Sequence, residues 1–507
     1  MFDASGIILP MTNKPRSQLL TALLARLRPA PPAAGASAMR LSEEGMFDVR
    51  RARLTNGLRV WVKARPGTGT VFLLLQVPVG SRHETKDNNG ISHFVEHMLF
   101  TGTAKWSEQE VVETVRRRGG EANARTGAED TDYWLHLKAD DLDFGLEWLE
   151  EVVFRSQLPE AKFEKEQQII LEEKGGALGG LEVVGELIED LGWGWNVFRA
   201  VQHRLFPQSS LLFPIIGYDR SLERLTHAQI VEFYKQHYVP NSMTLIVVGD
   251  VVADEVLAGA ARHFEAFPAG VVPPRPVSPP PQTGGFNLRL RGPNINDQGQ
   301  LLMGAPLPGL NHPDRWALTV LAEILHTRLT EDIRFKRGLV YGVDVYPALY
   351  TDVGHFVVYT TADTHKFDEI LAEVESQVER AIRGEIDAAA VAEAKTALRG
   401  RLLLSMEGNT DLGWWLSELS LFVPGEAPTP DLFAEVEAVM APDLARVAGQ
   451  YLTRDKRYQA VHRPGLTPER LALPVLVGTS LTLASLGAWL WARRRKQSRS
   501  RPALPPR

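Results

Sequence analysis

Residues Asn88–Thr103 read NNGISHFVEHMLFTGT, and this stretch decides how the rest of the chain is interpreted. It places His93 and His97 four residues apart, with Glu96 between them. On a helix, residues at i and i+4 project from the same face, so both imidazoles can reach one ion. The pattern predicts a helix that carries a metal site. The alternative is a surface helix with two solvent-facing histidines.

The order His-x-x-Glu-His is the reverse of the familiar zinc-peptidase motif, but it offers the same chemical groups. A catalytic zinc needs neutral imidazole ligands and an open position for water. A carboxylate beside that water can accept its proton. We therefore expect His93 and His97 to bind Zn²⁺ and Glu96 to act as a base without binding the metal.

A third ligand is expected in the segment FEKEQQIILEEKGG, because two imidazoles do not complete a catalytic zinc site. The chain has no cysteine, so this ligand must be a histidine or a carboxylate. Glu166, Ile169, Ile170 and Glu173 fall on one helical stripe, from which Glu172 is rotated away. Glu173 is therefore the predicted third ligand, and Glu166 could orient a histidine.

Length and composition limit the class of protein. A chain of 507 residues is too long for one compact core, which predicts two or more domains. The net charge of −6 gives no electrostatic case for nucleic-acid binding.

The body of the chain divides near its middle. The proline-rich segment at 267–285 cannot sustain a helix or a central strand and is expected to be a linker. On either side, at 43–266 and 286–465, the pattern is strands followed by a long helix. The expected fold is α+β, with two similar halves that each pack helices on an antiparallel-rich sheet. The first long helix of the second half carries Glu323 and His326 but no second histidine one turn away, so only the first half would hold a metal.

The two ends are expected to lie outside the globular body. Residues 471–492 contain no charge and end in tryptophans, and about 20 apolar residues suffice to span a bilayer. The basic tail at 493–507 favours a cytoplasmic C-terminus, which would place the body outside the cytoplasm. A buried core helix is the alternative for 471–492. Residues 1–42 are expected to be disordered or to form a weak targeting segment.

The quoted motifs, together with GGEANARTGAEDTDYWLHL and DIRFKRGLVYGV, resemble the pitrilysin/insulysin family of zinc peptidases, the inverzincins. The resemblance extends over most of the body. It is greatest to the shorter branch that includes the mitochondrial processing peptidases and their bacterial relatives. The family block usually has Glu-Arg where this chain has Glu166-Gln167.

The resemblance implies a metallopeptidase fold of the LuxS/MPP-like type, whose halves face each other around a peptide-binding cavity. It implies one Zn²⁺ per chain and the following roles: His93, His97 and Glu173 as ligands, Glu96 as general base, Glu166 as a supporting residue, Asn123 and Ala124 on a strand that pairs with substrate, and Arg334 and Tyr341 near the developing oxyanion.

The expected function is that of a zinc-dependent metalloendopeptidase acting on peptides or unfolded segments, with possible pairing of chains as a homo- or heterodimer. Two alternatives belong to other classes. One is a non-catalytic partner subunit, and the other is a membrane-anchored peptide-binding protein whose metal is structural.

Overall fold

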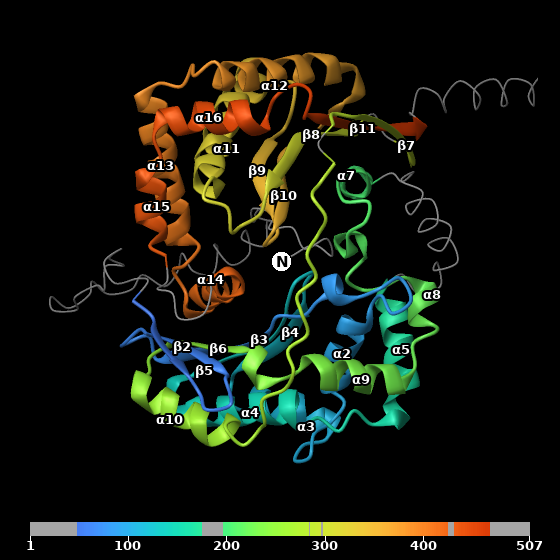
Figure 1. The fold of residues 1–507 in the computed structure, drawn as a ribbon, viewed down its shortest axis with the longest axis vertical. Coiled ribbons are helices and arrows are strands. Elements are labelled where there is room, and N and C mark those ends of the chain that lie inside the picture. Colours follow the sequence, from blue (N-terminus) through green and yellow to red (C-terminus); the bar gives the residue numbers. More distant parts are fainter. Residues whose placement is uncertain (1–47, 175–195, 283, 296–297, 424–429, 467–507) are drawn as a thin grey trace, which may run out of the picture.

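The structure is a computed structural model that describes residues 48–174, 196–282, 284–295, 298–423 and 430–466. The chain forms two α+β halves that face each other, each built on one sheet (Figure 1). The predicted two-sheet α+β architecture is therefore confirmed.

The N-terminal half contains a six-stranded sheet in the order β1-β2-β6-β3-β5-β4. Its strands are β1 (Arg50–Arg53), β2 (Arg59–Ala64), β3 (Thr70–Val77), β4 (Glu121–Thr126), β5 (Thr131–Lys138) and β6 (Thr244–Gly249). Its helices are α2 (Ile91–Leu99), α3 (Glu108–Arg116), α4 (Leu142–Phe154), α5 (Glu160–Lys174), α7 (Val197–Leu205), α8 (Asp219–Leu222), α9 (His227–His237) and α10 (Ala253–Phe264).

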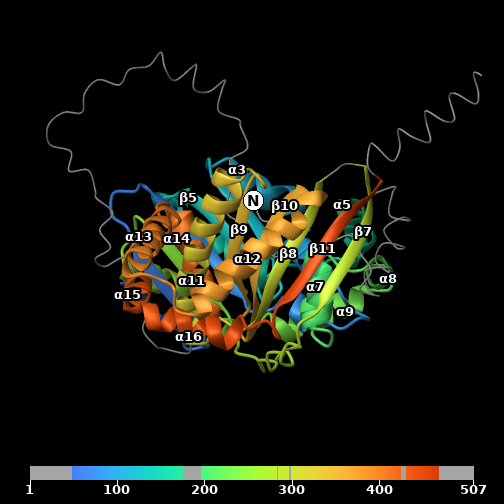
Figure 2. The ribbon, with the colours of Figure 1, turned by 90° about the horizontal axis from the view of Figure 1, so that it is seen from above.

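The C-terminal half contains a five-stranded sheet in the order β7-β11-β8-β10-β9. Its strands are β7 (Asn287–Ile295), β8 (Gln298–Pro308), β9 (Val343–Leu349), β10 (Val353–Asp363) and β11 (Tyr458–Leu466). Its helices are α11 (Arg315–Leu329), α12 (Phe367–Ile382), α13 (Ala388–Leu404), α14 (Asn409–Phe422), α15 (Leu432–Ala438) and α16 (Ala441–Tyr451). Seen from above, α11 and α12 lie across this sheet (Figure 2).

The two sheets share one topology. In each half the last strand inserts between the first two long strands and pairs in parallel with the earlier one, as β6 does with β2 and β11 with β7. The orders β2-β6-β3-β5-β4 and β7-β11-β8-β10-β9 then correspond strand for strand. This correspondence places α2 and α11, which follow β3 and β8, in equivalent positions.

Strand β3 shows how a sheet can be buried on both faces. Val71, Leu73 and Leu75 face the helices of their own half, because alternate side chains of a strand point to one side. Phe72 and Leu74 point to the other side and join the hydrophobic core of the C-terminal half. A strand buried on both sides lacks polar alternation, as in the run VFLLL.

The halves exchange helices across their interface. From the C-terminal half, α14 packs on β3 and β6 of the N-terminal sheet, and Gly413 on α14 lets Phe72 approach closely. From the N-terminal half, α7 packs on β7, β8 and β11 and contributes Val197, Val201 and Leu205 to a buried cluster. Each sheet is therefore covered partly by a helix of the other half.

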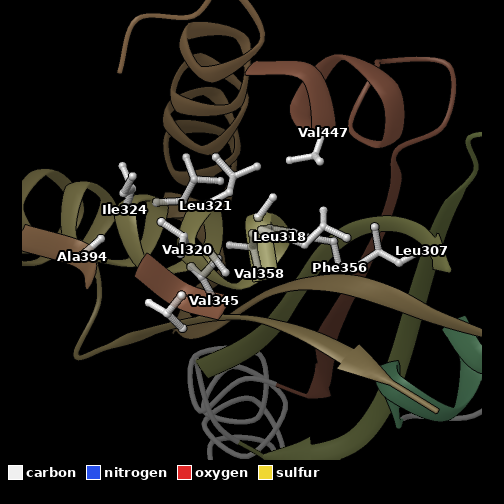
Figure 3. Packing of buried hydrophobic residues seen from close by; sticks show 14 of the residues in the cluster. Leu307, Leu318, Val320, Leu321, Ile324, Val345, Phe356, Val358, Ala394 and Val447 are labelled. Carbon is white, nitrogen blue, oxygen red and sulfur yellow. The ribbon is translucent and has the colours of Figure 1, made fainter. Parts of the chain in front are cut away.

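The core of the C-terminal half lies between its sheet and α11. Leu318 and Leu321 of α11 are fully buried, together with Phe356 and Val358 of β10 (Figure 3). Burying such a side chain contributes about 1.5–3 kcal/mol relative to leaving it exposed.

A buried ion-pair network joins the halves to the segment between them. The guanidinium of Arg82, 1% exposed, pairs with Glu129 of the N-terminal half and with Asp352 of the C-terminal half. It also donates to Ser278 Oγ at 3.1 Å. The described part of 265–286, to which Ser278 belongs, forms neither helix nor strand. The domain boundaries expected from the sequence stay a prediction.

The prediction of a membrane helix has to be corrected. In the described ranges, no helix combines the length and the apolar character needed to cross a bilayer. The predicted span at 471–492, the basic tail at 493–507 and the N-terminal segment at 1–42 lie outside the described residues. The single-pass anchor in the predicted fold and localisation is therefore corrected. It was predicted from the uncharged run, its tryptophans and its basic flank, and no described helix provides such a span.

Candidate metal centre

Helix α2 presents its polar residues on one side because its apolar residues recur at helical spacing. Phe94, Val95 and Met98 are fully buried. The histidines lie on the other side, where 13% of the His93 side chain and 20% of the His97 side chain are exposed. The helix predicted from the sequence motif is therefore present.

The beginning of α2 is held by a buried carboxylate. Gly90, at φ 94°, precedes the helix, and its amide donates to Glu84 Oε2 at 2.8 Å. The amide of Ser92 donates to Glu84 Oε1 at 2.9 Å, and Asn89 Nδ2 donates to Oε2 at 2.6 Å. Glu84 thus accepts from otherwise unpaired first-turn amides. Sequence analysis missed Glu84, which lies before the helix and outside the capping spacing.

Helix α5 brings the predicted third ligand to α2. The rings of Phe94 and Phe163 stack with centroids 4.9 Å apart and fix the contact between the two helices. Glu166 and Ile170 are buried, whereas Ile169 is 37% exposed. The buried part of the stripe inferred from the sequence is therefore narrower than expected, because Ile169 is exposed.

Three predicted ligands converge at one point. His93 Nε2 lies 3.9 Å and His97 Nε2 lies 3.5 Å from the same carboxylate oxygen, Oε2 of Glu173. One ligand atom from each residue lies within 4.8 Å of the others. Among the described residues, this is the one group of three such side chains close enough to share an ion. In the equivalent helix α11, Glu323 instead pairs with Arg401.

The group fits zinc by its donor set. Two imidazole nitrogens and one carboxylate oxygen, with a position left for water, make up a common catalytic zinc set. Glu166 Oε2 lies 3.5 Å from Nδ1 of His97, the nitrogen turned away from Glu173. A carboxylate in this position orients a ligating histidine and selects its tautomer.

The two histidines differ electrostatically. Burial, with a smaller effect of the His97 charge, lowers the pKa of His93 to about 3, so its imidazole is neutral at pH 7. Burial also opposes protonation of His97. The neighbouring carboxylates of Glu166, Glu96 and Glu173 outweigh it and raise the pKa of His97. Because only a neutral imidazole binds a metal, protonation of His97 competes with metal binding, and the metal affinity should rise with pH.

Glu96 lies beside the ligand group but is not part of it. Thr126 Oγ1 donates a hydrogen bond to Glu96 Oε2. Burial raises the pKa of Glu96, while the bond from Thr126 acts in the opposite direction. Thr126 was not among the predicted site residues, although strand alternation from Ala122 and Ala124 could have placed it on the side of α2.

A cavity of about 950 Å³ lies between the halves. The three predicted ligands His93, His97 and Glu173, called the metal group below, are among the residues that line it. Asn123, Ala124 and Thr126 of β4 line it, as do the three predicted ligands and Glu96. Much of its other wall is apolar and comes from the C-terminal half, including Trp316, Tyr346, Leu349, Trp415, Leu419 and Phe422.

Arg334 and Tyr341, predicted to approach the substrate, are not among the described residues that line this cavity. The Tyr341 side chain is 88% exposed and the neighbouring Phe335 is 71% exposed. The guanidinium of Arg334 lies 5.4 Å from the Tyr341 ring centroid and 5.1 Å from that of Phe335. The pair thus lies on the exposed surface and outside the lining of the chain's own cavity.

Comparison with known proteins identifies the family. Residues 59–177 match "Insulinase (Peptidase family M16)", and residues 224–398 match "Peptidase M16 inactive domain". The chain is 31% identical over 382 residues to an uncharacterised zinc protease of Mycobacterium leprae, covering 73% of this chain and 81% of that protein. It is 26% identical over 412 residues to the mitochondrial-processing peptidase subunit beta of Mus musculus, covering 79% and 81% of the two chains.

Solved structures show the same fold. The crystal structure of a protease from Helicobacter pylori superposes with a TM-score of 0.71 at 22% sequence identity, covering 82% of this chain and 99% of that one. With the sequence matches, which extend over both halves, this likeness confirms the resemblance inferred from the motifs. The chain belongs to peptidase family M16, the insulinase family, whose relatives include proteins named as zinc proteases.

Proposed function

We propose that this protein is a zinc-dependent metalloendopeptidase that hydrolyses peptides or unfolded segments. The observation that carries the proposal is the convergence of His93, His97 and Glu173, with Glu96 beside them, in a cavity large enough for a peptide. The names of the M16 relatives support a zinc-dependent peptidase.

Glu96 is the residue of this chain that moves the proton. Zinc, when bound, supplies Lewis-acid polarisation and makes water a stronger nucleophile. Glu96 accepts a proton as the water oxygen attacks the carbonyl carbon. It then delivers that proton to the departing amide nitrogen, so that one water is consumed and an acid and an amine are formed.

The substrate backbone would lie along β4. This strand is at the end of the sheet order, so one edge has no neighbouring strand of that sheet, and it lines the cavity. The amide of Ala124 donates to Oδ1 of Asn123 at 2.9 Å, a bond that an incoming peptide strand could replace. Strand addition binds through main-chain hydrogen bonds and has little regard for sequence.

The decisive variant is Glu96→Gln, which keeps the size of the side chain but removes its basic oxygen. We expect peptide cleavage to fall by roughly 100-fold or more, with zinc content unchanged, because Glu96 moves a proton and does not bind the metal. Metal analysis and cleavage of an unbiased peptide mixture, on wild type and variant, check this.

The possible outcomes separate the proposal from its alternative. Retained zinc with full turnover by Glu96→Gln would disprove the hydrolytic mechanism. A wild-type protein that holds zinc but cleaves no peptide favours a non-catalytic partner subunit, an alternative suggested by the match of 224–398 to an inactive domain. Treatment with a chelator, followed by restoration with Zn²⁺, shows whether activity depends on the metal.

We also propose that Arg334 and Tyr341 act on the cavity of a second chain. Both are exposed and lie outside the lining of their own cavity, yet a cation and a phenol are suitable donors to an oxyanion. A relative is named as a subunit of a processing peptidase, which supports pairing of chains. The homo- or heterodimer would then have composite sites.

A further inference from the structure

Thr126 occupies a position where the alternation of β4 turns a side chain towards α2. Ala122 and Ala124 lie on the same face of the strand and pack against the core that α2 shares. Their small side chains let α2 approach the strand. Thr126 is 8% exposed and is the last residue of β4, so its hydroxyl reaches Glu96 from a buried position.

The contact holds one specific oxygen of the carboxylate. Thr126 Oγ1 donates to Oε2 of Glu96. A glutamate has three side-chain torsions, so a carboxylate held at one oxygen has fewer orientations than a free one.

The donor sits on a rigid hairpin. Thr126 pairs with Thr131 across the β4–β5 turn, in which the amide of Gly127 donates to the carbonyl of Asp130 at 2.7 Å. The carbonyl of Gly127 accepts from the amide of Ser81 at 3.2 Å. Groups held in this way act at a fixed place and need little reorganisation.

We propose that Thr126 is a positioning residue for Glu96: its hydroxyl holds Oε2, so that Oε1 is presented to the attacking water. The inference rests on the proposed peptidase function. It assigns the hydroxyl of Thr126 a part in catalysis that acts through Glu96 and involves no contact with the metal group.

If Thr126 had only a structural role, its variants would rank in a different order of activity. Thr126→Val keeps the shape and loses the hydroxyl, whereas Thr126→Ser keeps the hydroxyl and loses a methyl group. Packing alone favours valine over serine in a buried position. Positioning of Glu96 favours serine over valine, so the two roles rank the variants in opposite orders.

The test measures kcat and KM for one peptide, zinc content, and crystal structures of the metal-free proteins. We expect Thr126→Val to lower kcat by roughly 10- to 100-fold, with KM within about twofold and zinc content unchanged, because a misplaced catalytic group costs rate. Thr126→Ser should restore most of kcat. In the crystal structures, the carboxylate of Glu96 should keep one orientation in wild type and Thr126→Ser and turn away or divide between orientations in Thr126→Val.

Thr131→Val is the matched control. Thr131 lies opposite Thr126 in the same hairpin, is fully buried, and donates its hydroxyl to the carbonyl of Val79 at 2.8 Å. Thr131→Val therefore shows how much the removal of a buried hydroxyl from this hairpin by itself changes kcat. We expect kcat to stay near the wild-type value.

Wild-type kcat in Thr126→Val, or an unchanged single orientation of Glu96 in its crystal structure, would overturn the inference. An equal loss of kcat in Thr131→Val would also overturn it, since the effect would then be structural. If the wild-type protein holds zinc but cleaves nothing, the proposed function fails, and the orientation of Glu96 in the crystal structures still decides whether Thr126 positions it.

Discussion

At the scale of single residues, His93 and His97 differ although they are one helical turn apart on α2. His93 is neutral because burial disfavours its charge, whereas His97 lies among carboxylates that stabilise the imidazolium. Glu166 is the carboxylate nearest to the nitrogen of His97 that faces away from Glu173. Its proposed role is to orient His97 for the metal.

Replacement of Glu166 by glutamine tests this role. We expect Glu166→Gln to weaken zinc binding by roughly 10- to 100-fold, because a ligating histidine loses the carboxylate that orients it and raises its basicity. Competition with a chromophoric chelator measures the affinity.

Glu164→Gln serves as the control, because Glu164 lies on the same helix and is exposed. An affinity for zinc that is equal in Glu166→Gln and wild type would exclude an orienting role for Glu166.

At the scale of elements, the site depends on how α2 begins. Gly90 has φ 94°, a left-handed conformation that side chains rarely adopt. A Cβ atom there would lie 2.8 Å from the Cα of Gly217 and 2.9 Å from the carbonyl oxygen of Ile216. The loop that contains Gly217 therefore packs directly on the first turn of the helix that carries His93 and His97.

Gly90→Ala should lower the free energy of unfolding by at least about 1–2 kcal/mol, since it adds left-handed strain to a backbone clash. It should also weaken zinc binding, because the shift occurs three residues before His93. Thermal or denaturant unfolding, together with zinc titration, measures the two effects.

A second glycine in a helix provides the comparison. A Cβ atom at Gly400 of α13 meets nothing within 4 Å, so Gly400→Ala should stabilise the protein by up to about 1 kcal/mol through helix propensity. Equal effects of the two substitutions would show that the contact at Gly90 is not tight.

At the scale of the whole molecule, the halves behave as one interlocked unit. The exchange of α7 and α14 and the network around Arg82 bury the contact between them as a protein core is buried. Breaking a buried ion pair by removing one partner typically costs about 3–5 kcal/mol. The cavity wall opposite the metal group is therefore held in place, while Arg334 and Tyr341 remain on the outside.

Complementation between two variants tests whether Arg334 and Tyr341 act in trans. One chain carries Glu96→Gln, and the other carries Arg334→Ala with Tyr341→Phe. Each should be inactive alone. Mixing equal amounts under exchange should restore about a quarter of the wild-type activity, since half of the dimers would hold one complete composite site.

Size-exclusion chromatography with light scattering establishes that the chains pair. Absence of restored activity despite demonstrated exchange would show that the residues do not act across chains. Full activity of the Arg334→Ala, Tyr341→Phe chain by itself would remove the pair from the site altogether.

The local arrangement of the candidate site could be predicted from the sequence because it depends on short spacings. The helix that carries His93, Glu96 and His97, and the stripe that carries Glu166 and Glu173, follow from helical periodicity. The two similar α+β halves follow from the repeated order of elements. The prediction of a membrane-spanning helix is corrected by the finding that no helix of the described residues could span a bilayer, and residues 471–492 lie outside that part of the chain.

The tertiary structure decided what depends on residues far apart in the chain. Thr126 reaches Glu96 across 30 residues, and Arg82 joins residues of both halves. It also placed Tyr341 outside the lining of the chain's own cavity. Periodicity reports which face of a helix or strand a side chain occupies, whereas only the packing of whole elements determines which faces meet.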